Sequence, residues 1–490
     1  MPTFSRLFPW PRKWLLWAAA GLALRLLLIW FPRPVDDDTI DYLQLGHNLF
    51  HHGIYGMEGG PYDLPNLFRL PAYPILLATF EQLFAGIWLR SWINAVFLVQ
   101  AVVDVTGCLL LASFVKRHIS SRAAQFALPL AMLCPFTAAY TGIALTESLS
   151  VFAIAWGIYS AGRALAAAVE GKRDVWALVG AGCAAGLAAM LRPDGALFCF
   201  ALAIGLFYYS LRPSSSIPAR PPALRRAIAA TAIYSLVALA PISVWTARNW
   251  LDFKVFQPLA PRYLNDPGET CIAGFYQWMR TWAVDYVSTG NVYWNIGTRS
   301  ISIRDLPSRA FDSPAQRALT AALLEEYNRT NSISPQLDAR FAALAVQRIR
   351  ANPLRYYLAV PLMRIADMML RPRTWSFGLD NFWWRWADHP GESLCAVLLG
   401  IVNLAYVAAA AFAFLRRQVP FAFMLGGYFL LRCLLLGTLE NPEPRYTLEC
   451  FPVLIVAAAA ALSHLPVAVP VPFRPRLWAA IHHPHPGPVS

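Results

Sequence analysis

The chain has 490 residues, of which 57% are hydrophobic and only 14% are charged. A soluble protein covers its surface with roughly 25% charged residues, so a soluble multidomain enzyme is excluded. The formal net charge is +13, but the basic residues stand in short clusters between apolar runs. This distribution carries membrane-topology information and argues against a nucleic-acid partner.

Apolar runs long enough to cross a bilayer recur along the chain and predict an all-α polytopic membrane protein. Ten membrane spans are predicted, at residues 14–31, 91–115, 123–140, 148–166, 174–191, 195–211, 226–248, 393–415, 419–437 and 448–465. The apolar stretches 71–87 and 354–370 are interpreted as short helices lying at the membrane surface. Counting both as membrane spans gives about twelve spans. This topology places several basic loops outside the cell and is therefore the second choice.

The basic clusters predict the orientation of the chain. With the N-terminus in the cytosol, each inside loop is basic, for example at Lys116 and Arg117 and at Arg416 and Arg417. Only four of the 41 basic residues are lysines, and with the abundant alanine this suggests a GC-rich bacterial genome. We therefore expect a multi-pass protein of a bacterial cytoplasmic (inner) membrane.

Four regions are predicted along the chain. Residues 1–248 form a membrane module with spans one to seven and the first outer loop (32–90), and residues 249–392 form a periplasmic outer-face domain with amphipathic helices. Ser313-Pro314 opens one such helix, and a second starts near Pro335. Residues 393–466 hold the C-terminal spans, and the Pro- and His-rich residues 467–490 form a disordered cytosolic tail.

In this topology most of the unusual charged residues fall on the outer side. They are the Asp36-Asp37-Asp38 run, Arg69, Glu147, Arg192-Pro193-Asp194, and the segment from Glu440 to Arg445. Arginine binds phosphate with two hydrogen bonds, and a carboxylate takes a proton from an attacking hydroxyl. Outer loops that combine both groups therefore favour chemistry on an anionic lipid headgroup.

Two charges lie within predicted spans. Arg25 and Asp104 are each roughly 16 Å from the cytosolic edge, at 1.5 Å per residue, on consecutive antiparallel spans. Equal depth favours a structural ion pair over a proton path.

An ordered set of motifs spans nearly the whole chain. It comprises Asp38-x-x-x-Tyr42-Leu-x-Leu-Gly-His-Asn48, then Arg69-x-Pro71-x-Tyr73-Pro74, Leu145-Thr146-Glu147, Gly186-Leu-x-x-x-Leu-Arg192-Pro193, Trp245-Thr-x-Arg248-Asn249 and Arg445-Tyr446. In these residues the chain resembles the GT-C superfamily of polyprenyl-phosphate-sugar-dependent glycosyltransferases. The resemblance is to the bacterial branch that includes protein O-mannosyltransferases and the lipid A aminoarabinose transferase.

The resemblance implies roles for particular residues. Asp38, four residues before Tyr42, matches the catalytic base, and Asp37 is the substitute candidate because Thr39 stands where many members have Glu. Glu147 matches an acidic residue that orients the acceptor or the base. Arg69, Arg192 and Arg445 are implied phosphate ligands, and the substrate-positioning candidates are Tyr42, Asn48, Tyr73 and Tyr446.

The implied reaction is a direct displacement. Asp38 deprotonates an acceptor hydroxyl on a lipid, glycan or protein, and this hydroxyl attacks the anomeric carbon of a polyprenyl-phosphate sugar with inversion. No Cys or His spacing typical of a metal site is present, so no metal ligands are predicted, although a divalent cation stays open as a cofactor. A secondary transporter and an O-antigen ligase or polymerase are the alternatives.

Overall fold

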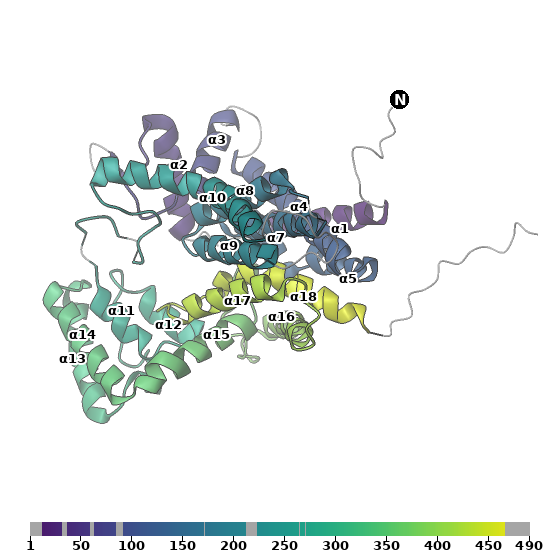
Figure 1. The fold of residues 1–490 in the computed structure, drawn as a ribbon. Helices are drawn as coiled ribbons and strands as arrows, with labels where there is room; N and C mark the ends of the chain where they lie inside the picture. The colour runs from purple at the N-terminus through teal and green to yellow at the C-terminus, as the bar shows by residue number, and fades with distance from the viewer. Residues whose placement is uncertain are drawn as a thin grey trace, which may run out of the picture.

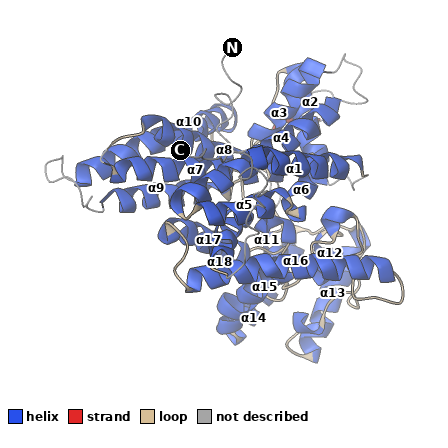
Figure 2. Ribbon diagram, turned by 90° about the vertical axis from the view of Figure 1, so that its right-hand side faces the viewer, coloured by secondary structure: helices blue, strands red, loops and turns tan. Residues whose placement is uncertain are grey.

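The computed structural model describes residues 12–31, 37–58, 63–84, 92–170, 172–211, 223–263, 265–269 and 271–465. Helix makes up nearly all of the regular structure (Figures 1 and 2). In the described part of the chain the strands are β1 (Gly56–Glu58) and β2 (Asp63–Pro65), which pair antiparallel with Met57 opposite Leu64. The predicted all-α class is therefore confirmed. The predicted tail, 467–490, lies outside the described residues.

The first half of the chain forms a bundle whose helices are mostly apolar. Its members are α1 (Arg12–Trp30), α2 (Asp37–His52), α3 (Ala72–Phe84), α4 (Trp92–His118), α5 (Ser121–Met132), α6 (Pro135–Ala139), η2 (Tyr140–Gly142), α7 (Glu147–Val169), α8 (Val175–Leu191), α9 (Gly195–Leu211) and α10 (Ala223–Phe253). In it α7 packs against α4 and α8, and α10 packs against α8 and α9. Small residues such as Ala181 and Ala185 are fully buried there, so the helices approach closely.

Helices cover all ten predicted spans. Within the described residues, seven stretches are long and apolar enough to cross a membrane, namely Arg12–Trp30, Trp92–His118, Ser121–Gly142, Glu147–Val169, Ala223–Phe253, Pro390–Leu415 and Pro444–Ser463. Three shorter apolar helices are Val175–Leu191, Gly195–Leu211 and Ala422–Gly437. These stretches make the protein a multi-pass membrane protein. By contrast, α3 has 13 residues and is about 20 Å long, which is short of the roughly 30 Å hydrocarbon core.

The third predicted span is broken, which the sequence analysis did not predict. Instead of one helix over 123–140, α5 ends at Met132 and α6 begins at Pro135. Proline has no N–H and disfavours helical backbone in the residue before it. Cys134 is accordingly extended, with φ −61° and ψ 109°.

Residues 271–351 form a helical unit with a core of its own. Its helices are α11 (Ala273–Arg280), α12 (Tyr286–Tyr293), η3 (Ser308–Ala310), α13 (Pro314–Thr330) and α14 (Pro335–Ala351). Ser313 and Ser334 cap α13 and α14, with Pro at the first helical position of each, so the predicted starts of both helices are confirmed. The core contains Trp278, Phe275 and Phe341. In Figure 1, α11, α13 and α14 lie at the end of the molecule away from α1 and α5.

The remaining helices pack between this unit and the bundle. They are η4 (Arg355–Ala359), α15 (Val360–Leu370), η5 (Trp375–Phe377), α16 (Pro390–Leu415), α17 (Ala422–Gly437), η6 (Pro444–Cys450) and α18 (Phe451–Ser463). Helix α15 is amphipathic as predicted, but Arg364 lies on its buried face while Leu362 and Met363 are exposed. Arg364 is buried because it donates to the carbonyl groups of Ala283, Gly437 and Arg280.

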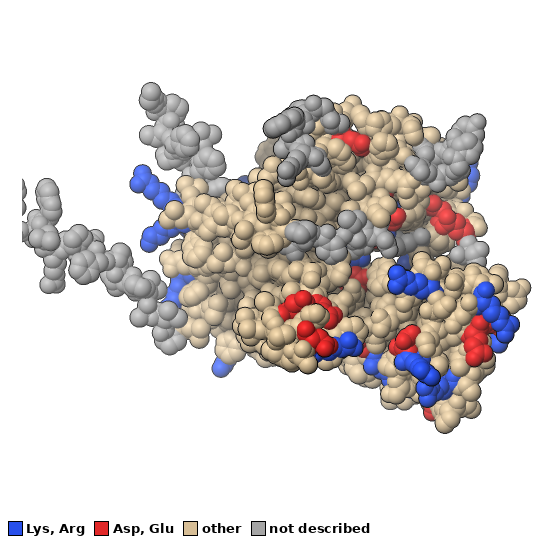
Figure 3. Space-filling view, turned by 180° about the vertical axis from the view of Figure 1, so that it is seen from behind, with Lys and Arg blue, Asp and Glu red and all other residues tan. Residues whose placement is uncertain are grey.

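The two ends of the molecule differ in charge. Lys116, at the end of α4, lies over the Trp14 ring near the start of α1, and Arg122 donates to the carbonyl of Leu465 after α18. The face drawn in Figure 3 is mostly uncharged, with Lys and Arg at its left edge and mixed acidic and basic groups at the lower right. The basic clusters of several helices thus gather at one end.

Candidate functional site

Asp38 lies between two arginines from distant parts of the chain. It stands in the first turn of α2, and its Oδ1 accepts from Arg69 Nη2 at 2.5 Å. Its Oδ2 accepts from Arg445 Nη2 at 2.7 Å. Arg69, in the loop before α3, also donates to Asp41 Oδ2 from Nε at 3.1 Å and from Nη2 at 2.7 Å. Arg445 lies in η6, where its Nε contacts Glu443.

These contacts set the charge of Asp38. Burial alone raises the pKa of a carboxyl group, but attraction to Arg445 and then to Arg69 outweighs it and lowers the pKa of Asp38 to about 2. Burial raises the pKa of the neighbouring Tyr42 to about 12, so its hydroxyl is neutral at physiological pH. The resting Asp38 is therefore a fully ionised but weak base.

A second set of ion pairs surrounds Arg192, which caps the C-terminus of α8. Arg192 donates from Nη1 to Glu147 Oε1 at 2.9 Å and from Nε to Asp194 Oδ1 at 3.3 Å. Its Nε also lies 3.3 Å from Glu449 Oε1. Arg432 of α17 completes the set, with its Nη2 2.9 Å from Asp194 Oδ2 and 2.6 Å from Glu449 Oε2.

Tyr446 joins the two sets. The guanidinium carbons of Arg192 and Arg445 each lie 5.4 Å from the centre of its ring. We call the whole cluster the charge network, and its members are Asp38, Asp41, Arg69, Glu147, Arg192, Asp194, Arg432, Glu443, Arg445 and Glu449. The carboxylates outnumber the guanidinium groups in it, so an anion that binds there has to displace carboxylates from arginine.

A cavity opens beside the charge network. Its lining includes Arg445, Glu443, Arg373, Tyr140 and Trp375. Arg445 thus contacts Asp38 and also lines the cavity. The cavity has a volume of about 20 Å³, which is room for a water-sized group next to the arginine that holds Asp38.

Asp38, Glu147 and the three predicted phosphate ligands lie in this one network. Asp38, Arg69 and Arg445 are in direct contact, and Glu147 is paired with Arg192. The side chain of Asp37, the substitute base, lies outside what the structure describes, as does Asp36.

The four predicted substrate-positioning residues differ in their settings. Tyr42 lies 5.4 Å from the Arg69 guanidinium and meets Tyr73 edge to face. Tyr73 is fully buried and donates to Gln100 at 2.8 Å. Asn48 is also buried, and its amide donates to the carbonyl of Gly56 at 3.0 Å, which holds the turn after α2. Of the four, Tyr446 and Tyr42 contact the arginines of the network.

Several members of the network were missed as site residues by the sequence analysis. Asp41 stands one position before the motif residue Tyr42, and Asp194 follows Arg192-Pro193. Both could therefore have been identified from the motifs beside them. Arg432 and Glu449 each sit within an apolar run. For Arg432 the sequence leaves phosphate binding and snorkelling to the membrane surface open, and Glu449 carries no motif signal. Their pairing depends on the approach of α17 to η6, which only tertiary structure gives.

The two intramembrane charges are brought together. Arg25 Nε donates to Asp104 Oδ2 at 2.7 Å, and both side chains are buried. Arg25 also donates to the carbonyls of Gly21 and Met132, each at 2.8 Å. The guanidinium group therefore joins α1 to α4 and to the end of α5, as a structural ion pair would.

Part of the chain matches a known family. Residues 71–245 match the family model of dolichyl-phosphate-mannose-protein mannosyltransferase. Over these residues the match confirms the predicted resemblance to polyprenyl-phosphate-sugar-dependent glycosyltransferases. None of the curated proteins matches the chain.

Solved structures from Archaeoglobus fulgidus and Cupriavidus metallidurans are similar to this one. The oligosaccharyltransferase of Archaeoglobus fulgidus, tethered with an acceptor peptide, has a TM-score of 0.48 and 14% sequence identity, over 92% of this chain and 49% of that chain. AglB from Archaeoglobus fulgidus, with an inhibitory peptide and a dolichol-phosphate, has a TM-score of 0.42 and 15% identity, over 94% of this chain and 51% of that chain. ArnT from Cupriavidus metallidurans, bound to undecaprenyl phosphate, has a TM-score of 0.41 and 13% identity, over 92% of this chain and 76% of that chain. This chain thus spans about half the length of the archaeal chains.

Proposed function

We propose that this protein is a membrane glycosyltransferase that moves a sugar from a polyprenyl-phosphate donor to an acceptor hydroxyl. The family match over residues 71–245 supports the donor class. The observation that carries the proposal is Asp38, held between Arg69 and Arg445 beside a cavity. The grouping of basic residues at the other end of the bundle supports a site on the outer face of a bacterial cytoplasmic membrane.

In this proposal Arg69 and Arg445 bind the phosphate of the donor. Both guanidinium groups can donate hydrogen bonds to a phosphate, but without substrate both are paired with carboxylates. A phosphate that accepts hydrogen bonds from Arg69 and Arg445 in place of Asp38 releases the Asp38 carboxylate from both arginines. The loss of these contacts, and the added negative charge nearby, raises the pKa of Asp38. Donor binding thereby converts a weak base into a stronger one.

The reaction then proceeds as a single displacement. The acceptor oxygen forms a bond to the anomeric carbon, and its proton passes to Asp38. The bond from the anomeric carbon to the phosphate oxygen breaks, and polyprenyl phosphate leaves with the bonding electrons, stabilised by the two arginines. One base without a covalent nucleophile gives inversion at the anomeric carbon.

Glu147 is the second carboxylate of the proposal. Its Oε1 accepts from Arg192, whereas its buried Oε2 has no hydrogen-bond partner within the described residues. A buried acceptor without a donor is costly, and a hydroxyl group of a bound substrate would satisfy it. We propose that Glu147 orients the acceptor.

The experiment that tests the proposal measures release of free polyprenyl phosphate by the purified protein. The donors offered are polyprenyl-phosphate mannose, glucose, galactose and arabinose, with a membrane extract to supply acceptors. We expect one donor to turn over and Asp38→Asn to lose roughly 10²–10⁴-fold of the rate, as for loss of a general base. EDTA added to the same assay measures metal dependence.

The matched control is Asp252→Asn. Asp252 is an exposed carboxylate that pairs with Arg248 one helical turn away, so its loss leaves the rate near that of the parent protein. If Asp38→Asn keeps full activity, Asp38 is not the base, and the assignment moves to Asp37 or Glu147. If no donor turns over, the result favours a secondary transporter or an O-antigen ligase or polymerase over the proposed glycosyltransferase.

A further inference from the structure

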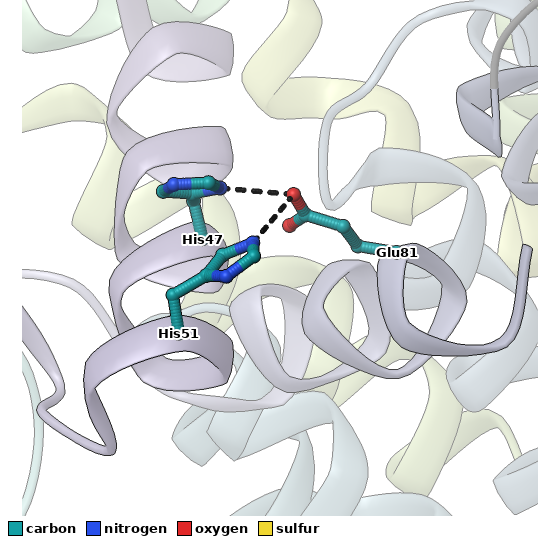
Figure 4. Close-up of side chains that lie close together, drawn as sticks. All are labelled: His47, His51 and Glu81. Carbon is teal, nitrogen blue, oxygen red and sulfur yellow. Dashed lines mark hydrogen bonds and ion pairs between the residues drawn. The ribbon is translucent and has the colours of Figure 1, made fainter. Parts of the chain in front are cut away.

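Two histidines of α2 and a glutamate of α3 meet at the surface of the protein. His47 and His51 stand four residues apart on α2, so they lie on the same face of this helix. Glu81 comes from α3, and Figure 4 shows its carboxylate pointing between the two imidazole rings. His47 Nδ1 lies 2.9 Å from Glu81 Oε1, and His51 Nε2 lies 3.5 Å from the same oxygen. Sequence analysis did not single out this group.

The spacing of the three groups fits a transition-metal ion. One ligand atom from each residue lies within 4.8 Å of the others. Zn²⁺ binds imidazole nitrogen at about 2.0–2.1 Å and carboxylate oxygen at about 2.0–2.2 Å, so tetrahedral ligand atoms stand about 3.3 Å apart. The two nitrogen–oxygen separations, 2.9 and 3.5 Å, bracket this value.

The exposure of the ligands also suits an open coordination site. The side chain of Glu81 is only 12% exposed, whereas those of His47 and His51 are 50% and 44% exposed. A nearly buried carboxylate requires a compensating charge. Within the described residues, the ion pairs of Glu81 are with these two imidazoles. An ion bound here would neutralise Glu81 and keep water as its remaining ligand.

The two helices already hold the ligands in place. A methyl group on Gly46, next to His47, would lie 3.1 Å from the carbonyl oxygen of Pro74 and 3.2 Å from Leu77 Cβ, so α2 and α3 are in close contact here. Leu77 is fully buried, and Glu81 follows it by one turn on the same face of α3. Little rearrangement is needed to bring the three ligands around an ion.

We propose that His47, His51 and Glu81 form a transition-metal site, suited to Zn²⁺, that clamps α2 to α3. Two imidazoles and one carboxylate are a donor set that favours Zn²⁺, Ni²⁺ or Cu²⁺ over Mg²⁺ and Ca²⁺, which prefer oxygen ligands. The inference stands on the geometry of these residues and does not depend on the proposed transferase activity.

The test is Zn²⁺ binding to the purified full-length protein after removal of metal with EDTA. Isothermal titration gives the affinity, and thermal unfolding gives the shift in Tm. We expect Zn²⁺ to bind and raise the Tm, and Mg²⁺ to do neither. His47→Ala, His51→Ala and Glu81→Gln each lose roughly tenfold or more of the Zn²⁺ affinity, together with the Tm shift.

The matched control is His52→Ala, which removes the neighbouring imidazole on the same helix and leaves the three ligands intact. It keeps the affinity and the Tm shift. The tail histidines His482, His483 and His485 are replaced together in a second control, because they offer imidazoles of their own. The proposal is overturned if the His51→Ala protein binds Zn²⁺ as tightly as the parent. It is also overturned if the tail variant alone abolishes binding, or if His52→Ala lowers the affinity as much as His51→Ala.

Discussion

Two arginines set the acid–base behaviour of Asp38. Its folded-state pKa, about 2, lies below the ordinary value of 3.8. A carboxyl group with a depressed pKa adds stability above its unfolded-state pKa, and this stability is lost as the pH falls through the folded-state pKa. The ion pairs with Arg69 and Arg445 are therefore complete above about pH 4 and lost toward pH 2.

We predict that Asp38→Asn destabilises the protein in a pH-dependent way. The difference between the folded-state and the ordinary pKa of Asp38 corresponds to about 2 kcal/mol at neutral pH. The side chain of Asp38 is 19% exposed, so solvent screens this contribution little. Thermal unfolding in detergent is measured for parent and variant between about pH 7 and pH 2.5. The difference in Tm is largest at neutral pH and shrinks toward the acid end.

The control for this series is Asp252→Asn, because the carboxylate of Asp252 in the parent protein is exposed. Its Tm stays close to that of the parent at every pH. A Tm difference for Asp38→Asn that does not change with pH would contradict the assigned ion pairs.

The turn between α8 and α9 carries two members of the charge network, Arg192 and Asp194. Arg192 ends α8, Asp194 follows, and Gly195 begins α9. A Cβ atom on Gly195 would lie 2.1 Å from the carbonyl oxygen of Ala188, which is backbone and does not move aside. The close approach of the two helices therefore requires glycine at this position.

We predict that Gly195→Ala pushes α9 away from α8 and displaces Arg192 and Asp194 from their partners. Overpacking of this kind costs typically 1–3 kcal/mol. We expect a lower Tm and lower polyprenyl phosphate release. Gly427→Ala is the control, because a Cβ at this helical glycine meets no atom within 4 Å. Alanine favours helix, so this variant is expected to unfold at or above the Tm of the parent. Equal Tm values for both variants and the parent would contradict the close packing of α8 against α9 at Gly195.

Arg364 connects the helical unit of residues 271–351 with the C-terminal helices. From α15 it donates to the carbonyl of Arg280, the last residue of α11, and to that of Ala283, which follows α11. It also donates to the carbonyl of Gly437, at the end of α17. These carbonyls lie in segments far apart in the sequence. One buried side chain thus satisfies three backbone acceptors.

We predict that Arg364→Met loosens the contact between the two parts. The variant leaves up to three buried carbonyls without a donor, at a cost of about 1–3 kcal/mol each. Thermal unfolding and limited proteolysis of the 271–351 unit measure the effect, and both are expected to show a less stable protein. Arg340→Met is the control, because its half-exposed ion pair with Glu326 contributes little. If the two variants behave alike, Arg364 does not hold the parts together.

Much of this protein could be predicted from its sequence. The long apolar helices are local features, because about 20 consecutive apolar residues demand a helix in a bilayer whatever surrounds them. The candidate arginines and carboxylates were likewise identified from short motifs and from their position outside the spans.

Only the tertiary structure decided which of these groups meet. Asp38 and Arg445 are 407 residues apart, and Arg432 and Glu449 stand within apolar runs, so no local pattern marks their pairing. The same holds for His47, His51 and Glu81, which meet because α2 packs against α3. Hydropathy and motifs act over one helix or loop, whereas an ion pair depends on positions that are set by the packing of the whole bundle.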